Sequence, residues 1–133
     1  MKIVSTKVQK IGISKLFSGY DTSTCCSRIR VTLNPLNGVV KDKQGSRAGT
    51  YQKASELINN RSYWNQIDGN NALWWDIITN VWMIGSSSNL GSDTGGIHSA
   101  QDSACPTSDN LFKYYDGDEW NLAPINSFSI QCV

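Results

Sequence analysis

Residues 61–85, RSYWNQIDGNNALWWDIITNVWMIG, hold four of the five tryptophans of this chain and decide its fold. Two turn signals, Asp68-Gly69 and Thr79-Asn80, divide the stretch into three parts. An Asp-Gly pair between apolar and aromatic residues favours a hairpin, because glycine accepts the positive φ that primed turns require. The stretch therefore predicts three successive antiparallel strands, at roughly 61–67, 71–77 and 80–85.

The adjacent pair Trp74-Trp75 raises the first functional question. Side chains alternate between the two faces of a strand, so these two indoles must point in opposite directions. One of them can enter the core of the domain. The other either packs against a further part of the chain or a subunit, or presents its flat face to a ligand.

The remaining segments also read as strands and turns. Residues 26–33 alternate, with Arg28 and Arg30 on one face and Ile29 and Val31 on the other. Residues 51–58 fit either a helical stripe or a strand that ends at an Asn-Asn turn, and the strand is preferred. The other expectations are a short strand at Val39-Val40, a polar loop over 41–49, a long loop over 86–103, a second hairpin over 111–122 and a last strand over 125–133.

The chain of 133 residues fits a single domain. Its first residues alternate apolar side chains with lysines, which predicts an N-terminal β extension over 1–24 ahead of a tryptophan-rich module over 25–133. No apolar run approaches the ~20 residues that span a bilayer, so membrane insertion is not expected. The predicted fold is all-β, an antiparallel meander that forms a sandwich or a barrel-like shape and carries two disulfides.

The four cysteines predict an extracellular protein. They show no metal-binding spacing, and the single histidine, His98, makes a zinc site of the usual type implausible. Two disulfides in a secreted domain are the simpler interpretation. Cys25 and Cys26 are adjacent, which leaves each of them to pair with Cys105 or Cys132. The triplet Asn60-Arg61-Ser62 is a glycosylation sequon at a predicted turn, consistent with secretion.

From residue 51 onward the order of residues resembles a small disulfide-bonded, tryptophan-rich module of invertebrate secreted and cell-surface proteins, which has no settled biochemical role. The resemblance covers residues 26–132 and leaves 1–24 outside. It implies an extracellular β domain with a Cys26–Cys132 bridge, so the favoured pairing is Cys26–Cys132 with Cys25–Cys105. The residues that carry it are Tyr51, Asn60-Arg61-Ser62-Tyr63, Leu73-Trp74-Trp75, Trp82-Met83-Ile84-Gly85, Gly95-Gly96, Cys105-Pro106, Tyr114-Tyr115-Asp116-Gly117, Trp120 and Ile130-Gln131-Cys132.

Charge is segregated along the sequence. Residues 1–61 carry eleven Lys and Arg against three acids, whereas residues 62–133 carry one Lys against eight acids. The two halves either interleave in space and cancel, or they form a basic surface for sulfated glycans, nucleic acid or another acidic partner. Nucleic acid is disfavoured, because the acidic half that holds the tryptophans would repel phosphates where the stacking platforms lie.

Catalytic and metal-binding readings of the sequence are weak. His98, with Ser99 or Ser103 and with Asp102, is the one imaginable nucleophilic triad, and no nucleophile elbow accompanies it. The acids at 116, 118 and 119 share a turn. Calcium needs six to eight converging oxygens, so this turn alone does not support a calcium site, and no cofactor is expected.

The sequence thus predicts a secreted, non-catalytic recognition module that binds carbohydrate, with hydrolysis around His98 ranked third. The alternative is a structural or adhesive extracellular protein that binds protein partners, or forms homo-oligomers, through the same aromatic face. Indoles stack on the apolar faces of sugar rings, while amide and carboxylate groups bond to hydroxyls. The expected ligand-binding residues are Trp64, Asn65, Asp68, Asn70, Trp74, Trp75 and Asp76.

Overall fold

The computed structural model describes residues 21–34 and 38–133. Within them, nine antiparallel strands form one sheet with the order β8-β7-β6-β5-β4-β3-β2-β1-β9. The strands are β1 (Arg28–Leu33), β2 (Gly49–Ile58), β3 (Arg61–Gln66), β4 (Asn71–Asp76), β5 (Val81–Ser86), β6 (Ile97–Ser99), β7 (Phe112–Tyr115), β8 (Trp120–Leu122) and β9 (Phe128–Cys132).

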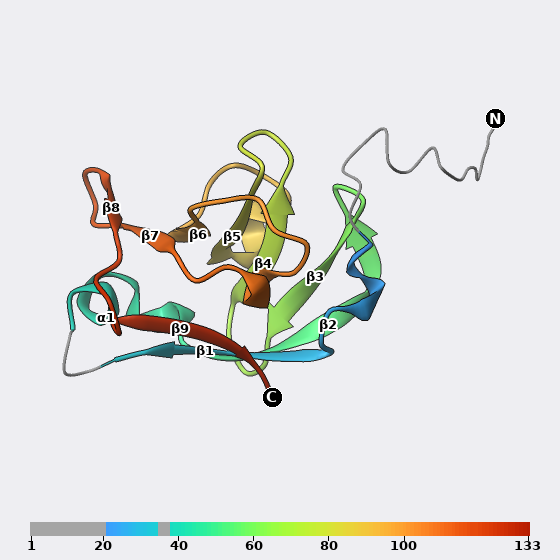
Figure 1. The fold of residues 1–133 in the computed structure, drawn as a ribbon, viewed down its shortest axis with the longest axis horizontal. Helices are drawn as coiled ribbons and strands as arrows, with labels where there is room; N and C mark the ends of the chain where they lie inside the picture. Colours follow the sequence, from blue (N-terminus) through green and yellow to red (C-terminus); the bar gives the residue numbers. More distant parts are fainter. Residues whose placement is uncertain (1–20, 35–37) are drawn as a thin grey trace.

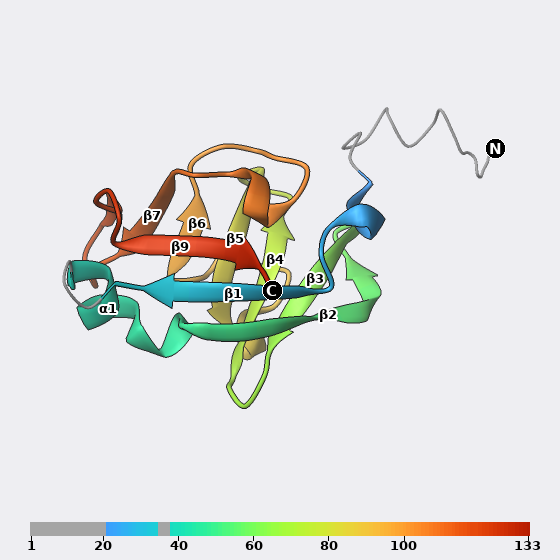
Figure 2. The ribbon, with the colours of Figure 1, turned by 60° about the horizontal axis from the view of Figure 1, so that its bottom comes forward.

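The sheet curls on itself, so that one of its faces becomes an interior. Strands β1, β2 and β9 lie together along the bottom of the molecule in Figure 1, and β4 to β7 cross behind them in the view of Figure 2. Strands β1 to β8 are neighbours in the sheet in the order in which they follow in the chain. Strand β9 returns to pair with β1 and forms the edge opposite β8. The predicted all-β, barrel-like antiparallel fold is confirmed.

The predicted hairpins are present, with one difference in turn chemistry. Asp68, not Gly69, adopts the positive φ in the β3–β4 turn, at 59°. At Gly69 the side chain of Gln66 limits the space instead: a Cβ there would lie 2.0 Å from Oε1 of Gln66, so that side chain would have to move. The β2–β3 turn has positive φ at both Asn59 and Asn60. Asparagine tolerates this conformation better than most residues, which explains the sharp reversal.

The expected strand at Val39-Val40 is wrong. These residues begin the helix α1 (Val39–Gln44), which is followed by the 3₁₀ turn η4 (Gly45–Arg47), so the expected loop over 41–49 is also partly helical. Local sequence did not show this because distant contacts hold the segment. Gln44 donates to the carbonyl oxygen of Tyr115 at 2.8 Å, across 71 residues of sequence.

The long segment 86–103 is less irregular than expected. It contains the 3₁₀ turn η5 (Ser87–Asn89) and the strand β6, which pairs with β5 on one side and β7 on the other. Ile97 and Ser99 are buried on the inner face. Such a strand has only three residues, and its pairing with β7 depends on residues 112–114, which a local pattern cannot reveal.

Most of the predicted N-terminal β extension lies outside the described residues. Its last part, Thr22–Thr24, forms the 3₁₀ turn η2, and not a strand. The Nζ atom of Lys53 holds this turn to the sheet by donating to the carbonyl oxygens of Thr22, Ser23 and Cys25 at 3.3, 3.2 and 2.6 Å. Asp21 caps η2 by accepting from the backbone N–H of Ser23.

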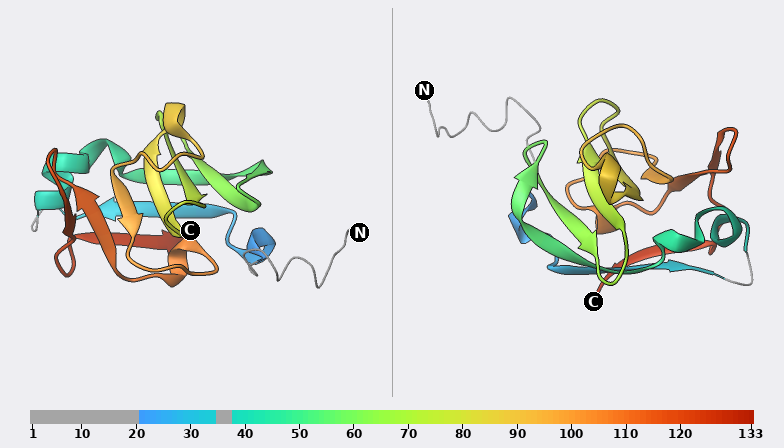
Figure 3. Two further views of the ribbon diagram at one scale, coloured as in Figure 1. Left: turned by 90° about the horizontal axis from the view of Figure 1, so that it is seen from above. Right: turned by 180° about the vertical axis from the view of Figure 1, so that it is seen from behind.

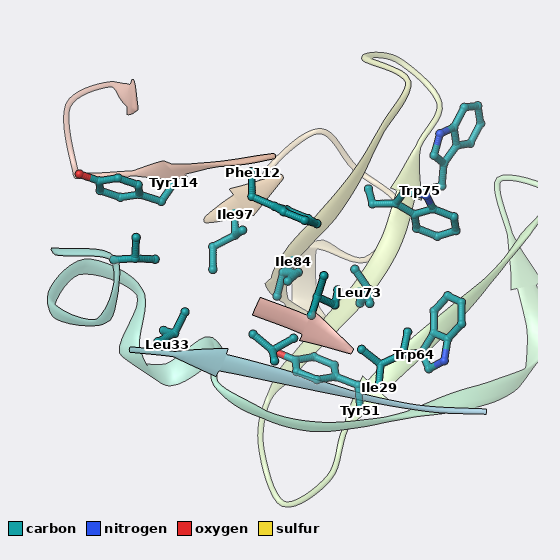
Figure 4. Packing of buried hydrophobic residues seen from close by; sticks show 14 of the residues in the cluster. Ile29, Leu33, Tyr51, Trp64, Leu73, Trp75, Ile84, Ile97, Phe112 and Tyr114 are labelled. Carbon is teal, nitrogen blue, oxygen red and sulfur yellow. The ribbon is translucent and has the colours of Figure 1, made fainter. Parts of the chain in front are cut away.

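The main core fills the inside of the curl. The alternation predicted for β1 is confirmed, because Ile29, Val31 and Leu33 are buried there while Arg28 and Arg30 are exposed. Figure 4 shows aromatic and aliphatic side chains from strands far apart in sequence converging on this interior. Burial of this apolar surface is the main stabilising contribution to such a fold. Its largest members are Trp64, Trp75, Trp82, Tyr51, Phe112 and Tyr114.

Both predicted disulfides are present. Cys25 pairs with Cys105 and Cys26 pairs with Cys132, with Cα–Cα distances of 5.6 and 5.8 Å. The adjacent cysteines therefore tie the start of β1 to two different places, the segment before η6 (Pro106–Ser108) and the end of β9. No helix in the described part of the chain has the length and apolarity needed to cross a membrane.

Candidate functional site

The tryptophans expected to bind ligand are buried. Trp64 and Trp74 have no exposed surface, and Trp75 is 4% exposed. Their indole N–H groups are also occupied: they donate to Cys26 O, Ser92 O and Asp102 Oδ1, respectively. No face of these three rings is open to a sugar, so the stacking role expected from the sequence has no surface through which to act.

Trp74 and Trp75 do point to opposite faces of β4, as alternation predicts. Trp75 enters the main core, while Trp74 forms a second buried cluster with Ala72 and Met83 on the outer face. Residues 86–96 cover that cluster so closely that a Cβ on Gly95 would lie 2.5 Å from Sδ of Met83. The second tryptophan is therefore covered by the chain itself.

The polar members of the predicted site do not gather around an exposed ring. Asp76 is fully buried, and its carboxylate accepts from the backbone N–H of Ile78 and the hydroxyl of Thr79 within the β4–β5 turn. Asn65, Asp68 and Asn70 are exposed. Asn65 lies on the outer face of β3, and the other two belong to the β3–β4 turn. The predicted set is thus not one site.

The residues of the imagined triad are each engaged elsewhere. Asp102 accepts from the guanidinium of Arg61 at 3.2 Å and from Trp75. The hydroxyl of Ser99 is buried and donates to Gln101 O, and that of Ser103 donates to Cys105 O. His98 bonds to the carbonyl oxygen of Ser99. These contacts give no relay between a base and a nucleophile.

One tryptophan of the five remains accessible: Trp120, which is 36% exposed. It begins β8, the outermost strand of the sheet, and lies directly opposite Tyr115 of β7. On β7 the buried Phe112 and Tyr114 alternate with Lys113 and Tyr115, so the latter two face outward. His98 lies between the buried Ile97 and Ser99 and faces outward as well.

His98, Tyr115 and Trp120 form what we call the aromatic surface. The ring centroids of His98 and Trp120 lie 4.4 Å apart with the planes inclined at 56°. Those of Tyr115 and Trp120 lie 5.5 Å apart at 55°. These spacings are those of favourable aromatic pairs, so the two neighbours fix the orientation of the indole. Trp120 is therefore a preoriented ring in a side chain that is partly exposed to solvent.

The turn that joins β7 to β8 supports this arrangement. One carboxylate oxygen of Asp116 accepts from the backbone N–H groups of Asp118 and Glu119 at 2.8 and 2.9 Å, and the other accepts from Asn121 at 2.8 Å. These bonds, with that of Glu119 largest, lower the pKa of Asp116. Its carboxylate is therefore committed to the turn. Among the described residues, no three His, Cys, Asp or Glu side chains converge as metal ligands.

His98 contributes a neutral imidazole. Its Nδ1 lies 2.7 Å from the carbonyl oxygen of Ser99, which can only accept, so Nδ1 carries the proton. Nε2 is then an acceptor. Partial burial lowers the pKa of His98, and the charge of Lys113 lowers it further, whereas the backbone bond to Ser99 and the charge of Asp76 raise it.

Two further side chains flank the aromatic surface. Lys113 pairs across the sheet with His98 on one side and with Leu122 on the other. Leu122 is exposed. The surface therefore combines an indole, a cation, a neutral acceptor and an apolar residue within one end of the sheet. Figure 3 shows that α1 lies at this same end, beside the β7–β8 hairpin.

The sequence did contain a signal for this surface. The sequence of residues 111–122 predicts a second hairpin that carries a tyrosine pair and Trp120. Lys113 and Tyr115 are two residues apart, so they lie on the same face of a strand, and the charge of Lys113 predicts that this face is exposed to solvent. The sequence pattern does not predict that His98 lies beside Trp120, because this contact depends on the pairing of β6 with β7.

Asn60, the predicted glycosylation site, is exposed at the tip of the β2–β3 turn. The other two sequon residues are buried: Arg61 stacks on Trp75, and the hydroxyl of Ser62 donates to Thr22 O. Modification of Asn60 stays a prediction.

No protein-family model, no curated protein and no solved structure matches this chain.

Proposed function

We propose that this protein is a secreted, non-catalytic carbohydrate-binding module whose ligand stacks on Trp120. The observation that carries the proposal is the partly open, preoriented indole between His98 and Tyr115. Because its neighbours already hold the ring, binding costs little side-chain entropy. The two disulfides favour an oxidising, extracellular location.

The chemistry around the ring suits a polyol better than a purely apolar ligand. The apolar C–H face of a sugar would cover the indole, while the Nε2 acceptor of His98 and the ammonium of Lys113 would meet hydroxyl groups at its edge. The rest of the ring stays in contact with protein, so a single sugar unit fits the exposed area. Absence of a relay between His98, Ser99 and Asp102 supports binding without catalysis.

The second candidate, a structural or adhesive protein, has its own supporting observation. Leu111, Leu122 and Ile125 are exposed near the same end of the molecule, at 44%, 57% and 85%. Exposed aliphatic groups of this size often mark contacts with another protein or with a second copy. In this alternative Trp120 would be part of a protein interface, and sugars would have no effect on it.

The test is a titration of the 133-residue protein with neutral oligosaccharides selected on a glycan array, followed by isothermal titration calorimetry, which does not depend on the fluorescence of Trp120 itself. We expect a saturable change that disappears in Trp120→Ala. Ile78→Ala is the matched control, because it also removes an exposed apolar side chain, 69% exposed, but at the β4–β5 turn. Retention of sugar binding in Trp120→Ala would contradict the proposal. Concentration-dependent self-association that Trp120→Ala or Leu122→Ala abolishes, without any response to sugars, would favour the adhesive alternative.

A further inference from the structure

The outer face of β1, β2 and β9 carries two arginines that the interior of the protein does not use. Arg28 and Arg30 are exposed on the same face of β1, two residues apart, which separates their Cα atoms by roughly 6–7 Å. Figure 2 views the strands from this side, with the rest of the sheet behind them. We call this face, with its neighbours on the adjacent strands, the arginine face.

Each guanidinium is oriented by a neighbour on β2. Nε of Arg28 donates to Oε1 of Gln52 at 2.8 Å, and Nε of Arg30 donates to Oγ1 of Thr50 at 3.0 Å. Gln52 is itself held, because its amide donates to Ser27 O. These Nε bonds are the only ones that either guanidinium makes with the described residues. The terminal nitrogens, with four N–H groups on each side chain, therefore face solvent.

No carboxylate neutralises these charges within the described part of the chain, where the salt bridge is that of Arg61 with Asp102. The side chains around the arginines on this face are neutral and polar. Thr50 and Gln131 flank Arg30, while Gln52 lies beside Arg28. Two neighbouring guanidinium groups that have no carboxylate partner among the described residues can bind sulfate, carboxylate or phosphate groups in bidentate fashion through their terminal N–H groups.

Next to Arg30 the face opens into a hollow of about 490 Å³. Thr32 and Ser129 form a cross-strand pair at its edge, whereas Phe128, which also lines it, directs its ring toward the core, where it packs on Phe112. The lining is completed by Asn34 and Asn126. Hydroxyl and amide groups can bond to the hydroxyls of a sugar unit, so the hollow and the arginines together suit a glycan that carries anionic groups.

We infer that the arginine face binds a linear anionic glycan, with its sulfate or carboxylate groups on Arg28 and Arg30 and a sugar unit in the adjacent hollow. This site is separate from the aromatic surface and does not rest on the function proposed for it. A nucleic acid fits less well. Its bases would find no exposed aromatic ring beside the arginines on which to stack, because the ring of Phe128 packs on Phe112.

The experiment uses the protein with all 133 residues, and dextran sulfate and uncharged dextran as matched probes that differ only in sulfation. We expect binding to dextran sulfate in low salt and none to dextran. The double variant Arg28→Gln/Arg30→Gln should weaken that binding by about tenfold or more, because it removes both charge-assisted contacts. Lys41→Gln/Lys43→Gln is the matched control, since it removes the same charge from exposed positions on α1. The affinity of this control variant for dextran sulfate should stay within about threefold of that of the parent protein. Salt screens the attraction between exposed charges that lie more than about a Debye length apart, so removing charges on α1 should have little effect.

Three results would overturn the inference. Equal losses in the two double variants would show general attraction to positive charge, including that of the lysines in residues 1–20. No binding to dextran sulfate at 50 mM salt, a condition of about 14 Å Debye length, would remove the site altogether. Tighter binding to single-stranded DNA, with the same dependence on the arginines, would assign the face to nucleic acid. Trp120→Ala should leave dextran sulfate binding unchanged, so failure of this site is distinguishable from failure of the aromatic surface.

Discussion

The guanidinium carbon of Arg61 lies 3.7 Å from the ring centroid of Trp75, in the interior of the protein. A buried cation of this kind is stable only when it is paired and hydrogen-bonded. Trp82 lies on another side, 5.6 Å away, and Nη1 donates to Asp102 Oδ1 and Ser103 O. The tryptophans that looked like a binding surface thus serve in part to enclose an arginine.

The first prediction concerns the charge that compensates Arg61. Asp102→Asn keeps an acceptor oxygen but removes the negative charge, and Asp102 is about one third exposed. We expect the free energy of unfolding to fall by about 1–3 kcal/mol, below the cost for a fully buried pair because water screens the site. Urea denaturation measures the change. Asp93→Asn, an exposed acid in the segment after η5, should change stability by less than about 0.5 kcal/mol. Equal effects of the two variants would contradict the role given to Asp102.

The second prediction concerns the cover over Trp74. In Gly95→Ala the new Cβ would meet Sδ of Met83 at 2.5 Å and the carbonyl oxygen of Ile84 at 2.9 Å. The segment must shift, so we expect a loss of about 1–3 kcal/mol. Gly45→Ala is the control, because nothing lies within 4 Å of its Cβ position and its backbone is helical. That variant should be neutral or stabilise by up to about 1 kcal/mol. Thermal and urea unfolding of the pair decide it, and a Gly95→Ala protein as stable as the parent would refute the tight packing.

The hairpins were predictable because their signals are local. Turn residues such as Asp68 and Asn59 sit next to the strands they join, and alternation along β1 separates Arg28 and Arg30 from the buried side chains. The helix α1 and the strand β6 were missed for the opposite reason. Their conformation is set by bonds and pairings with β5 and β7 that lie far away in sequence.

The candidate site was harder to predict than the fold. Alternation correctly placed Trp74 and Trp75 on opposite faces, yet it cannot say that residues 86–96 cover the outer one. Exposure of Trp120 follows from its place on an edge strand of three residues, and its neighbour His98 comes from a separate strand. Which tryptophan is open to solvent is therefore a property of the assembled sheet.

The third prediction concerns the disulfides. The bridges span 80 and 106 residues of sequence, and in the chain-entropy model each stabilises by about 4–5 kcal/mol. Because that contribution grows only with the logarithm of loop length, the two should differ by less than about 0.5 kcal/mol. Cys25→Ala/Cys105→Ala and Cys26→Ala/Cys132→Ala, compared by urea denaturation, measure both. Cys25 is buried and Cys132 is exposed, so any excess loss should fall on the first pair. A clearly larger loss for the second pair would show that chain entropy is not the controlling term.

The last prediction concerns pH. Burial lowers the pKa of His98 below its ordinary value of 6.5, so the folded protein binds fewer protons at this site than the unfolded chain. Stability must then rise with pH across this window, and it must fall as pH drops from about 6.5 toward the lowered pKa. His98→Gln removes this titrating group, so the free energy of unfolding of the variant should depend less on pH in that window. At lower pH, carboxylates such as Asp116 determine how stability changes with pH. Urea denaturation at a series of pH values gives both curves. If they stay parallel between pH 6.5 and 5, His98 is not held in its neutral form beside Trp120, and the acceptor assigned to its Nε2 is lost.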